Sequence, residues 1–173
     1  MSSAVGASVL VHVAQQVKQR GDGQFSDSDG QLLASLPPEE LRVLQLASEL
    51  VTRRCVTKVS ATPSKRNFFR VSSLNRYRSS NGDREVDRSV DGMSQPFDNS
   101  LISGGGPNYY NCFRHYCTCA AFHETTVTTH PTAMCKHMVA RLLADATGQF
   151  ETMEVEDIHF AQMLCPPRST GDE

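Results

Sequence analysis

Four side chains that can bind a metal stand in two tight pairs in the second half of this 173-residue chain. The first pair is Cys117-Thr118-Cys119, and the second, Cys135-Lys136-His137, follows after fifteen intervening residues. Structural zinc sites use cysteine and histidine, and three thiolates with one imidazole complete a tetrahedral shell. Because one residue separates the members of each pair, each pair must lie on a sharp bend or at a helix start. The sequence therefore predicts a zinc site made of Cys117, Cys119, Cys135 and His137.

Three further side chains near the pairs are alternative ligands. Cys112 lies five residues before Cys117, and His123 and His130 lie in the threonine-rich stretch between the pairs. Histidines in loops are more often solvent-exposed than metal-bound, and a shell of four is complete without Cys112. A cluster of buried or disulfide-bonded cysteines is the competing interpretation.

The composition favours metal binding over disulfides. Hydrophobic residues make up 39% of the chain and charged residues 21%, which is typical of a soluble globular protein. No apolar run approaches the roughly 18 residues that span a bilayer, and we expect no secretory signal because the first residues lack a basic segment. In the reducing cytosol or nucleus, clustered cysteines indicate a metal site.

The charge is unevenly distributed along the chain. The net charge is -2, but residues 53–88 hold ten Lys or Arg against three acids, and residues 145–173 hold seven acids against Arg168. A basic middle and an acidic end favour a surface for nucleic acid or an acidic protein on one side only. Two solvated faces of opposite sign explain the same pattern.

The elements that must position the metal pairs follow from the apolar spacing. Valines at every fourth position from Val5 to Val17 predict an amphipathic helix within residues 1–24. Residues 25–72 predict a helical pair and then a β-hairpin with a basic tip, formed by residues 55–60 and 67–72. Residues 73–107 are polar and Gly-rich and predict a disordered insertion.

Residues 108–148 predict the zinc-pinned unit. A third strand over 108–113 leads into the first pair, and a helix that begins at Cys135 and ends at Gly148 carries the second. Residues 149–173 predict a short helix, capped by Thr152, and a polar tail. The expected fold class is α+β, with a small antiparallel three-stranded sheet packed against helices.

The motif and its surroundings resemble the SWIM-type zinc-finger family of Shu-complex subunits. The resemblance rests on the stretch from Tyr109 to Phe122 and on Cys135-Lys-His-Met-Val-Ala140, and it extends over roughly residues 28–72 and 108–164. It implies that Cys117, Cys119, Cys135 and His137 bind zinc. It also implies a RecA-family recombinase paralogue as partner, a role in recombinase filament assembly during homologous recombination and double-strand break repair, and a nuclear location.

Two non-enzymatic functions remain open at this point. A zinc shell of four protein ligands leaves no position for substrate, and the chain has no GK[ST] phosphate loop, so we assign no catalytic residue. In the first function the zinc unit docks a partner protein, and single-stranded DNA is reached only indirectly. In the second the basic hairpin binds single-stranded DNA itself. The candidate phosphate contacts are Arg53, Arg54, Lys58, Lys65, Arg66 and Arg70.

Overall fold

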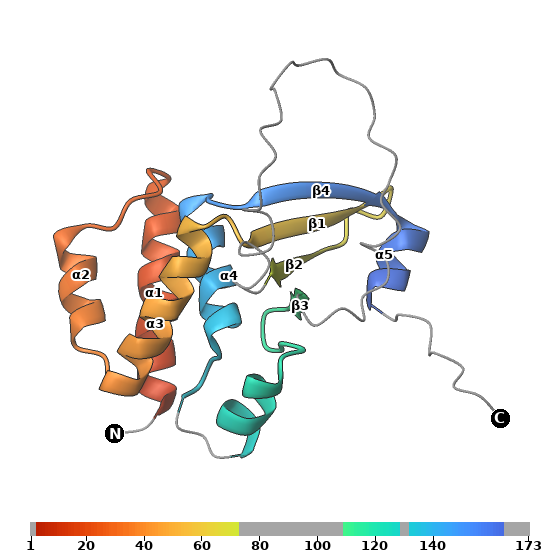
Figure 1. Cartoon of the computed structure of the whole chain (residues 1–173). Helices are drawn as coiled ribbons and strands as arrows, with labels where there is room; N and C mark the ends of the chain where they lie inside the picture. Colours follow the sequence, from red (N-terminus) through yellow and green to blue (C-terminus); the bar gives the residue numbers. More distant parts are fainter. Residues whose placement is uncertain (1–2, 73–108, 129–131, 165–173) are drawn as a thin grey trace, which may run out of the picture.

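The computed structural model describes residues 3–72, 109–128 and 132–164. Within them, helices gather at one end of a four-stranded sheet and a short helix packs at the other end (Figure 1). The predicted insertion at 73–107, His130 and the polar tail beyond residue 164 lie outside the described residues. No helix in the described part of the chain has the length and apolar character needed to cross a membrane.

The N-terminal helix α1 (Ser3–Arg20) follows the valine spacing. Val13 and Val17 are buried against Ala146 of helix α4 (Lys136–Thr147), so the valine stripe packs inside this chain. The helix ends where Gly21 takes a left-handed conformation, with φ at 72°. Only glycine adopts that conformation without steric cost, which makes residue 21 a natural helix end.

Helices α2 (Asp27–Ala34) and α3 (Pro38–Thr52) follow α1. Ser26 caps α2, and the buried Asp29 accepts bonds from the Ser26 backbone and from Arg20 at 2.5 Å. The Arg20 guanidinium and the Ser26 donors lower the pKa of Asp29 to about 2. This contact fixes α2 to the end of α1. Helix α3 packs against α4 through Ala47 and Leu50.

The sheet has four strands, so the prediction of three strands was wrong. The strands are β1 (Val56–Thr62), β2 (Asn67–Ser72), β3 (Tyr109–Cys112) and β4 (Glu151–Glu156), in the order β3-β2-β1-β4. The predicted hairpin forms antiparallel, with Val59 opposite Phe68, and β3 extends it. β4 runs parallel to β1 where a helix capped by Thr152 was expected. The free edge of β1 offers backbone hydrogen-bond partners to residues Glu151–Glu156. This pairing overrides the helical preference of the Glu and Met residues in that segment.

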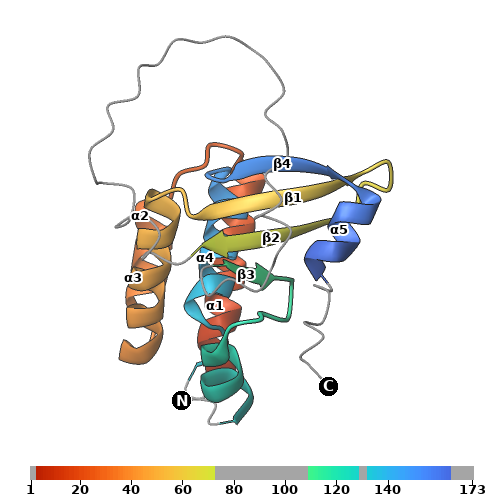
Figure 2. The same ribbon diagram turned by 45° about the vertical axis from the view of Figure 1, so that its right-hand side comes forward.

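Different helices cover the two faces of the sheet. On one face Val56 and Phe69 pack against α4 and α3. On the other face Val59 and Phe68 pack against α5 (Asp157–Leu164), which lies at the far end of the sheet from α1, α2 and α3 (Figure 2). This arrangement places β3 and the start of α4 side by side, where the two metal-ligand pairs lie.

Candidate metal centre

The first pair lies on a tight turn that follows β3. The Phe113 backbone N–H donates to the Tyr116 carbonyl at 2.8 Å, and Cys112 and Cys117 face each other as an antiparallel bridge. The Thr118 N–H then donates to the Asn111 carbonyl at 3.2 Å. This short ladder turns the chain back on itself, so Cys117 and Cys119 both point toward the interior, where each is buried.

The second pair lies at the beginning of α4. Cys135 is the N-cap residue, with an extended backbone, and His137 lies in the first helical turn. The Cys135 carbonyl accepts the N–H of Val139 at 3.1 Å and so starts the helix. The next apolar residues, Met138 and Val139, are buried, and they anchor the helix start beneath the first pair.

The two pairs come together as one buried group. The ligand atoms of Cys117, Cys119, Cys135 and His137 lie within 4.8 Å of one another, and no residue of the four exceeds 3% exposure. The Cys117 Sγ lies 4.0 Å from His137 Nδ1. Sulfur ligands of a tetrahedral zinc, at about 2.3 Å from the metal, stand ~3.8 Å apart. The buried Cys3His group therefore fits zinc, and these four side chains would hold it as a structural ion.

The directions of the cysteine pKa shifts are consistent with a cation at this site. Hydrogen bonds from Cys117 and Cys135 lower the pKa of Cys119, and the Phe122 backbone N–H, 3.3 Å from its Sγ, adds to this effect. The pKa values of Cys117 and Cys135 are raised, chiefly by hydrogen bonding to neighbouring cysteines. A divalent cation would allow all three thiolates to form.

The structure shows two contacts around the ligands that the sequence did not predict. The Tyr110 ring stacks on the His137 imidazole, with 4.2 Å between ring centroids, and orients it toward the cysteines. The Phe122 N–H bond to Cys119 comes from a π-helical segment, Phe122–Thr128, in a stretch predicted to be a loop. The period-2 spacing of Tyr110 and Cys112 on β3 is a signal that both point to the metal side.

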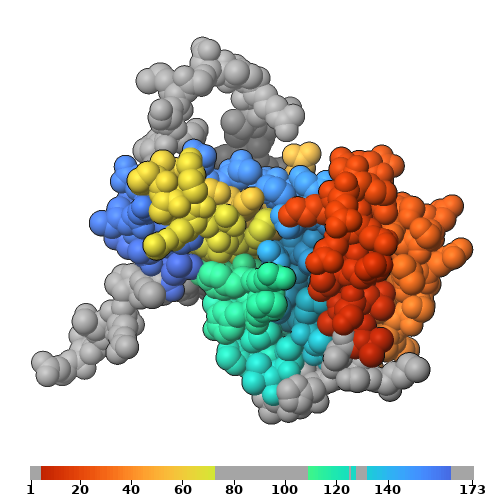
Figure 3. Space-filling model, turned by 180° about the vertical axis from the view of Figure 1, so that it is seen from behind, coloured from red at the N-terminus to blue at the C-terminus, as the bar shows by residue number. Residues whose placement is uncertain are grey.

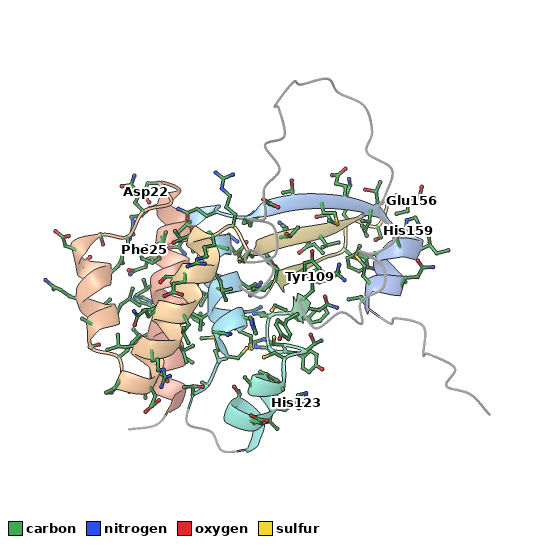
Figure 4. The ribbon with its side chains drawn as sticks, viewed as in Figure 1. Asp22, Phe25, Tyr109, His123, Glu156 and His159 are labelled. Atoms are coloured by element: carbon green, nitrogen blue, oxygen red, sulfur yellow. The ribbon has the colours of Figure 1, made fainter. Side chains whose placement is uncertain are left out.

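Two of the alternative ligands, Cys112 and His123, lie outside the group of four, and the third, His130, is not among the described residues. Cys112 is buried and its Sγ is 3.5 Å from Cys117 Sγ, so it touches one ligand without joining the group. His123 is exposed and packs edge-on against Tyr116 and Phe122. In Figure 4 it lies on the π-helical segment, well below Tyr109 on β3. The ligand assignment stays a prediction, which metal analysis of variants tests.

The six basic candidates for phosphate contact do not form one patch. Arg53 and Arg54 lie at the end of α3, whereas Lys65 and Arg66 lie at the hairpin tip. The seven-residue strand β1 separates the two groups, which at about 3.3 Å per residue amounts to ~23 Å.

The other two basic candidates occupy opposite faces of the sheet. Lys58 lies over the rings of Phe69 and Phe150 on the α4 side. Arg70 is only 4% exposed and donates to the Asn111 side chain. An exposed phosphate backbone cannot reach Arg70 in this conformation.

The neighbouring strand adds negative charge beside the hairpin. Glu154 of β4 stands opposite Ser60 of β1, and Glu156 stands opposite Thr62. Figure 4 shows Glu156 at the end of β4 near α5. These carboxylates are exposed, so they repel a nucleic-acid backbone that approaches this edge.

Comparison with known proteins supports the metal centre. The chain is similar to zinc finger SWIM domain-containing protein 7 of Danio rerio, with 36% identity over 73 residues. The match covers 40% of this chain and 52% of that protein, so the chain spans about half the length of the curated relative it matches. The similarity supports a SWIM-domain family.

No family model matches the chain, and no solved structure matches it. The relative is a zinc-finger domain protein, a class that is generally non-enzymatic. Together, this similarity and the buried Cys3His group support a zinc-finger protein that binds zinc.

Proposed function

We propose that this chain is a non-enzymatic SWIM zinc-finger subunit of a Shu-type complex in the nucleus. Its partner is a RecA-family recombinase paralogue. The pair promotes recombinase filament assembly on single-stranded DNA in homologous recombination and double-strand break repair. The observation that carries the proposal is the buried Cys3His group in a chain similar to zinc finger SWIM domain-containing protein 7.

The form of the metal centre favours docking over chemistry. Four protein ligands fill a tetrahedral shell, so zinc here has a structural role and activates no water. Zinc bound at this place joins the sheet edge β3 to the start of helix α4. It thereby fixes the position of α4 relative to residues 109–128, which we call the finger. A rigid surface of this kind is what a permanent partner requires.

The partner experiment is co-purification of the full chain with the RecA-family paralogue of the same organism. We expect a complex of one chain of each protein in size-exclusion chromatography. The Cys117→Ser variant, which loses zinc, should lose the complex. The Cys55→Ser variant should keep it, because Cys55 is not one of the four ligands and a serine hydroxyl can donate to the Arg53 carbonyl as the thiol does. Failure of the zinc-loaded wild-type chain to bind the paralogue would refute the proposed partner.

Direct binding of single-stranded DNA is the second candidate function, and the charge of residues 53–70 motivates it. The separation of the basic side chains and the acids of β4 count against it. The test is fluorescence anisotropy of a labelled oligothymidylate with the chain alone. Tight binding that falls steeply with salt and is lost in Lys65→Glu/Arg66→Glu would establish the second function in place of the first.

A further inference from the structure

A groove runs along the molecule between α1 and the finger, with α4 as its floor. It encloses about 840 Å³ and is lined by α1, by the turn and π-helical segment of the finger, and by α4. In the view from behind, α4 is recessed between α1, in red, and the finger, in green to teal (Figure 3). The groove does not contain the metal ligands, so it is a separate feature of the fold.

The groove has the length and the apolar floor of a helix-binding site. Its lining residues on α1 extend from Ala7 to Lys18, which at about 1.5 Å per residue is ~16 Å, or roughly three helical turns. Met134, just before α4, and Leu142 of α4 are partly buried and form part of the floor, and Val11 of α1 remains 36% exposed beside them. Methionine side chains adapt to the shape of an apolar partner, as known peptide-binding grooves show.

The rim of the groove is basic. Lys18, Arg114 and Arg141 line it, against the single acid Asp145. Asp145 already pairs with Lys18 at 2.7 Å. Among the described residues, Arg114 and Arg141 have no ion pair, and the Arg141 guanidinium lies over the Phe69 ring, 5.2 Å from its centroid. Two guanidinium groups without an ion pair beside an apolar floor are complementary to carboxylates carried by an apolar partner segment.

We propose that this groove binds an acidic amphipathic helix of the partner protein. Apolar side chains on one face of that helix contact Val11 and Leu142. Carboxylates on its flanks contact Arg114 and Arg141. The identity of the partner as the RecA-family paralogue rests on the proposed function; the chemistry of the bound segment rests on the groove alone.

The first test measures binding of the purified paralogue to groove variants by biolayer interferometry. Val11→Glu and Arg114→Glu should each weaken binding by about tenfold or more, because one removes an apolar contact and the other reverses a charge. The matched controls are Val5→Glu, at a valine of α1 that is 58% exposed and outside the groove lining, and Arg66→Glu at the hairpin tip. Both controls should bind as wild type.

Zinc content and unfolding temperature of each variant show whether it is folded. If the wild-type chain binds the paralogue and both folded groove variants bind equally well, the groove proposal is wrong and the proposed function stands. If the wild-type chain does not bind the paralogue, the proposed function fails, and the second test decides the groove proposal independently.

The second test identifies what occupies the groove in cells. A photo-crosslinking amino acid replaces Gln15, an exposed lining residue, and in a control chain it replaces Gln19, which is exposed on α1 outside the lining. Mass spectrometry then reads the sequence of the crosslinked segment. We expect a segment with helical apolar spacing and several Asp or Glu, and exchange of one of its acids for Arg should restore binding to the Arg114→Glu variant.

Each other outcome of the crosslinking contradicts the proposal. A basic segment, a segment without helical apolar spacing, or a second copy of this chain would replace it with a different occupant. Crosslinking no stronger at position 15 than at position 19 would show that nothing occupies the groove.

Discussion

The metal centre depends on four ligands and on the side chains that orient them. Spacing and residue type alone predicted that these four side chains act together, and the structure places their ligand atoms within 4.8 Å of one another. Their role as zinc ligands stays a prediction. The stacking of Tyr110 on His137 was not predictable, because it depends on the distance between β3 and α4. Ala120 and Ala121 are exposed, just before the π-helical segment begins.

Removal of two ligands should abolish zinc binding. The double variant Cys117→Ser/His137→Ala leaves two of four ligands, and the loss of metal removes folding free energy on the order of 10 kcal/mol. We expect no stoichiometric zinc by elemental analysis and loss of the near-ultraviolet circular dichroism of the finger. The control Cys112→Ala keeps all four ligands and should keep one zinc per chain. Retention of one equivalent by the double variant would show that other residues hold the metal.

Glu40 is a second residue whose setting only the structure reveals. Its carboxylate is buried and, among the described residues, accepts no hydrogen bond. It packs against Gly6 of α1 so closely that a Cβ at position 6 would overlap it. Burial raises the pKa of Glu40. The folded protein therefore binds this proton more tightly than the unfolded chain, and stability falls as the pH rises through the pKa of the folded state.

The Glu40→Gln substitution should stabilise the protein in a pH-dependent way. The amide has nearly the same size but no charge to desolvate, so the unfolding temperature should rise at pH 8 and change less at pH 5. Thermal unfolding at the two pH values measures the difference. Glu39→Gln, at the exposed neighbouring position, is the matched control and should leave the profile unchanged. An equal effect of Glu40→Gln at both pH values would contradict the role of burial.

At the scale of elements, the sequence predicted the helices and the hairpin but not β4. Apolar spacing defines α1, α3 and α4 because each buries one face. β4 has only Val155 buried, and its exposed glutamates resemble a helix in composition. It is a strand because β1 has a free edge beside it, which is a tertiary cause that no local pattern contains.

The packing of α5 beneath β1 and β2 gives an element-scale prediction. Phe160 is 7% exposed and meets the Phe68 ring edge-on at 5.2 Å, so Phe160→Ala should cost about 3–5 kcal/mol of unfolding free energy. Ile158→Ala on the same helix removes a side chain that is 62% exposed and should cost about 0.5 kcal/mol or less. Urea unfolding measures both. Equal effects of the two substitutions would mean that α5 does not pack as described.

At the scale of the whole molecule, the predicted sections are not separate units. β2 belongs to section 25–72 and β3 to section 108–148, yet Val71 pairs with Tyr110 in one sheet. β4, from section 149–173, completes the same sheet beside β1. The amino-acid composition changes at the boundaries of the predicted sections. Strand pairing between distant segments, however, decides which sections fold together, and composition carries no information on that pairing.

The register of β2 and β3 predicts that the segment between them is dispensable for folding. Ser72 pairs directly with Tyr109, so a connection of two to five residues can close this antiparallel pair as a hairpin. Replacement of residues 73–108 by Asn-Gly should leave zinc content and the unfolding temperature close to wild type. A matched deletion of Glu151–Glu156 removes β4 and should lower stability sharply. Insoluble or zinc-free protein after the first deletion would show that the segment contributes to the fold.

The parallel pairing of β1 with β4 has a consequence for synthesis on the ribosome. β1 and β2 can pair early, but the strand that covers the other edge of β1 is made only after the whole finger and α4. Until then that edge presents unpaired backbone groups, the kind of surface that chaperones bind and that aggregation begins from. The nascent chain therefore passes through a stage at which its metal ligands are complete and its sheet is still open.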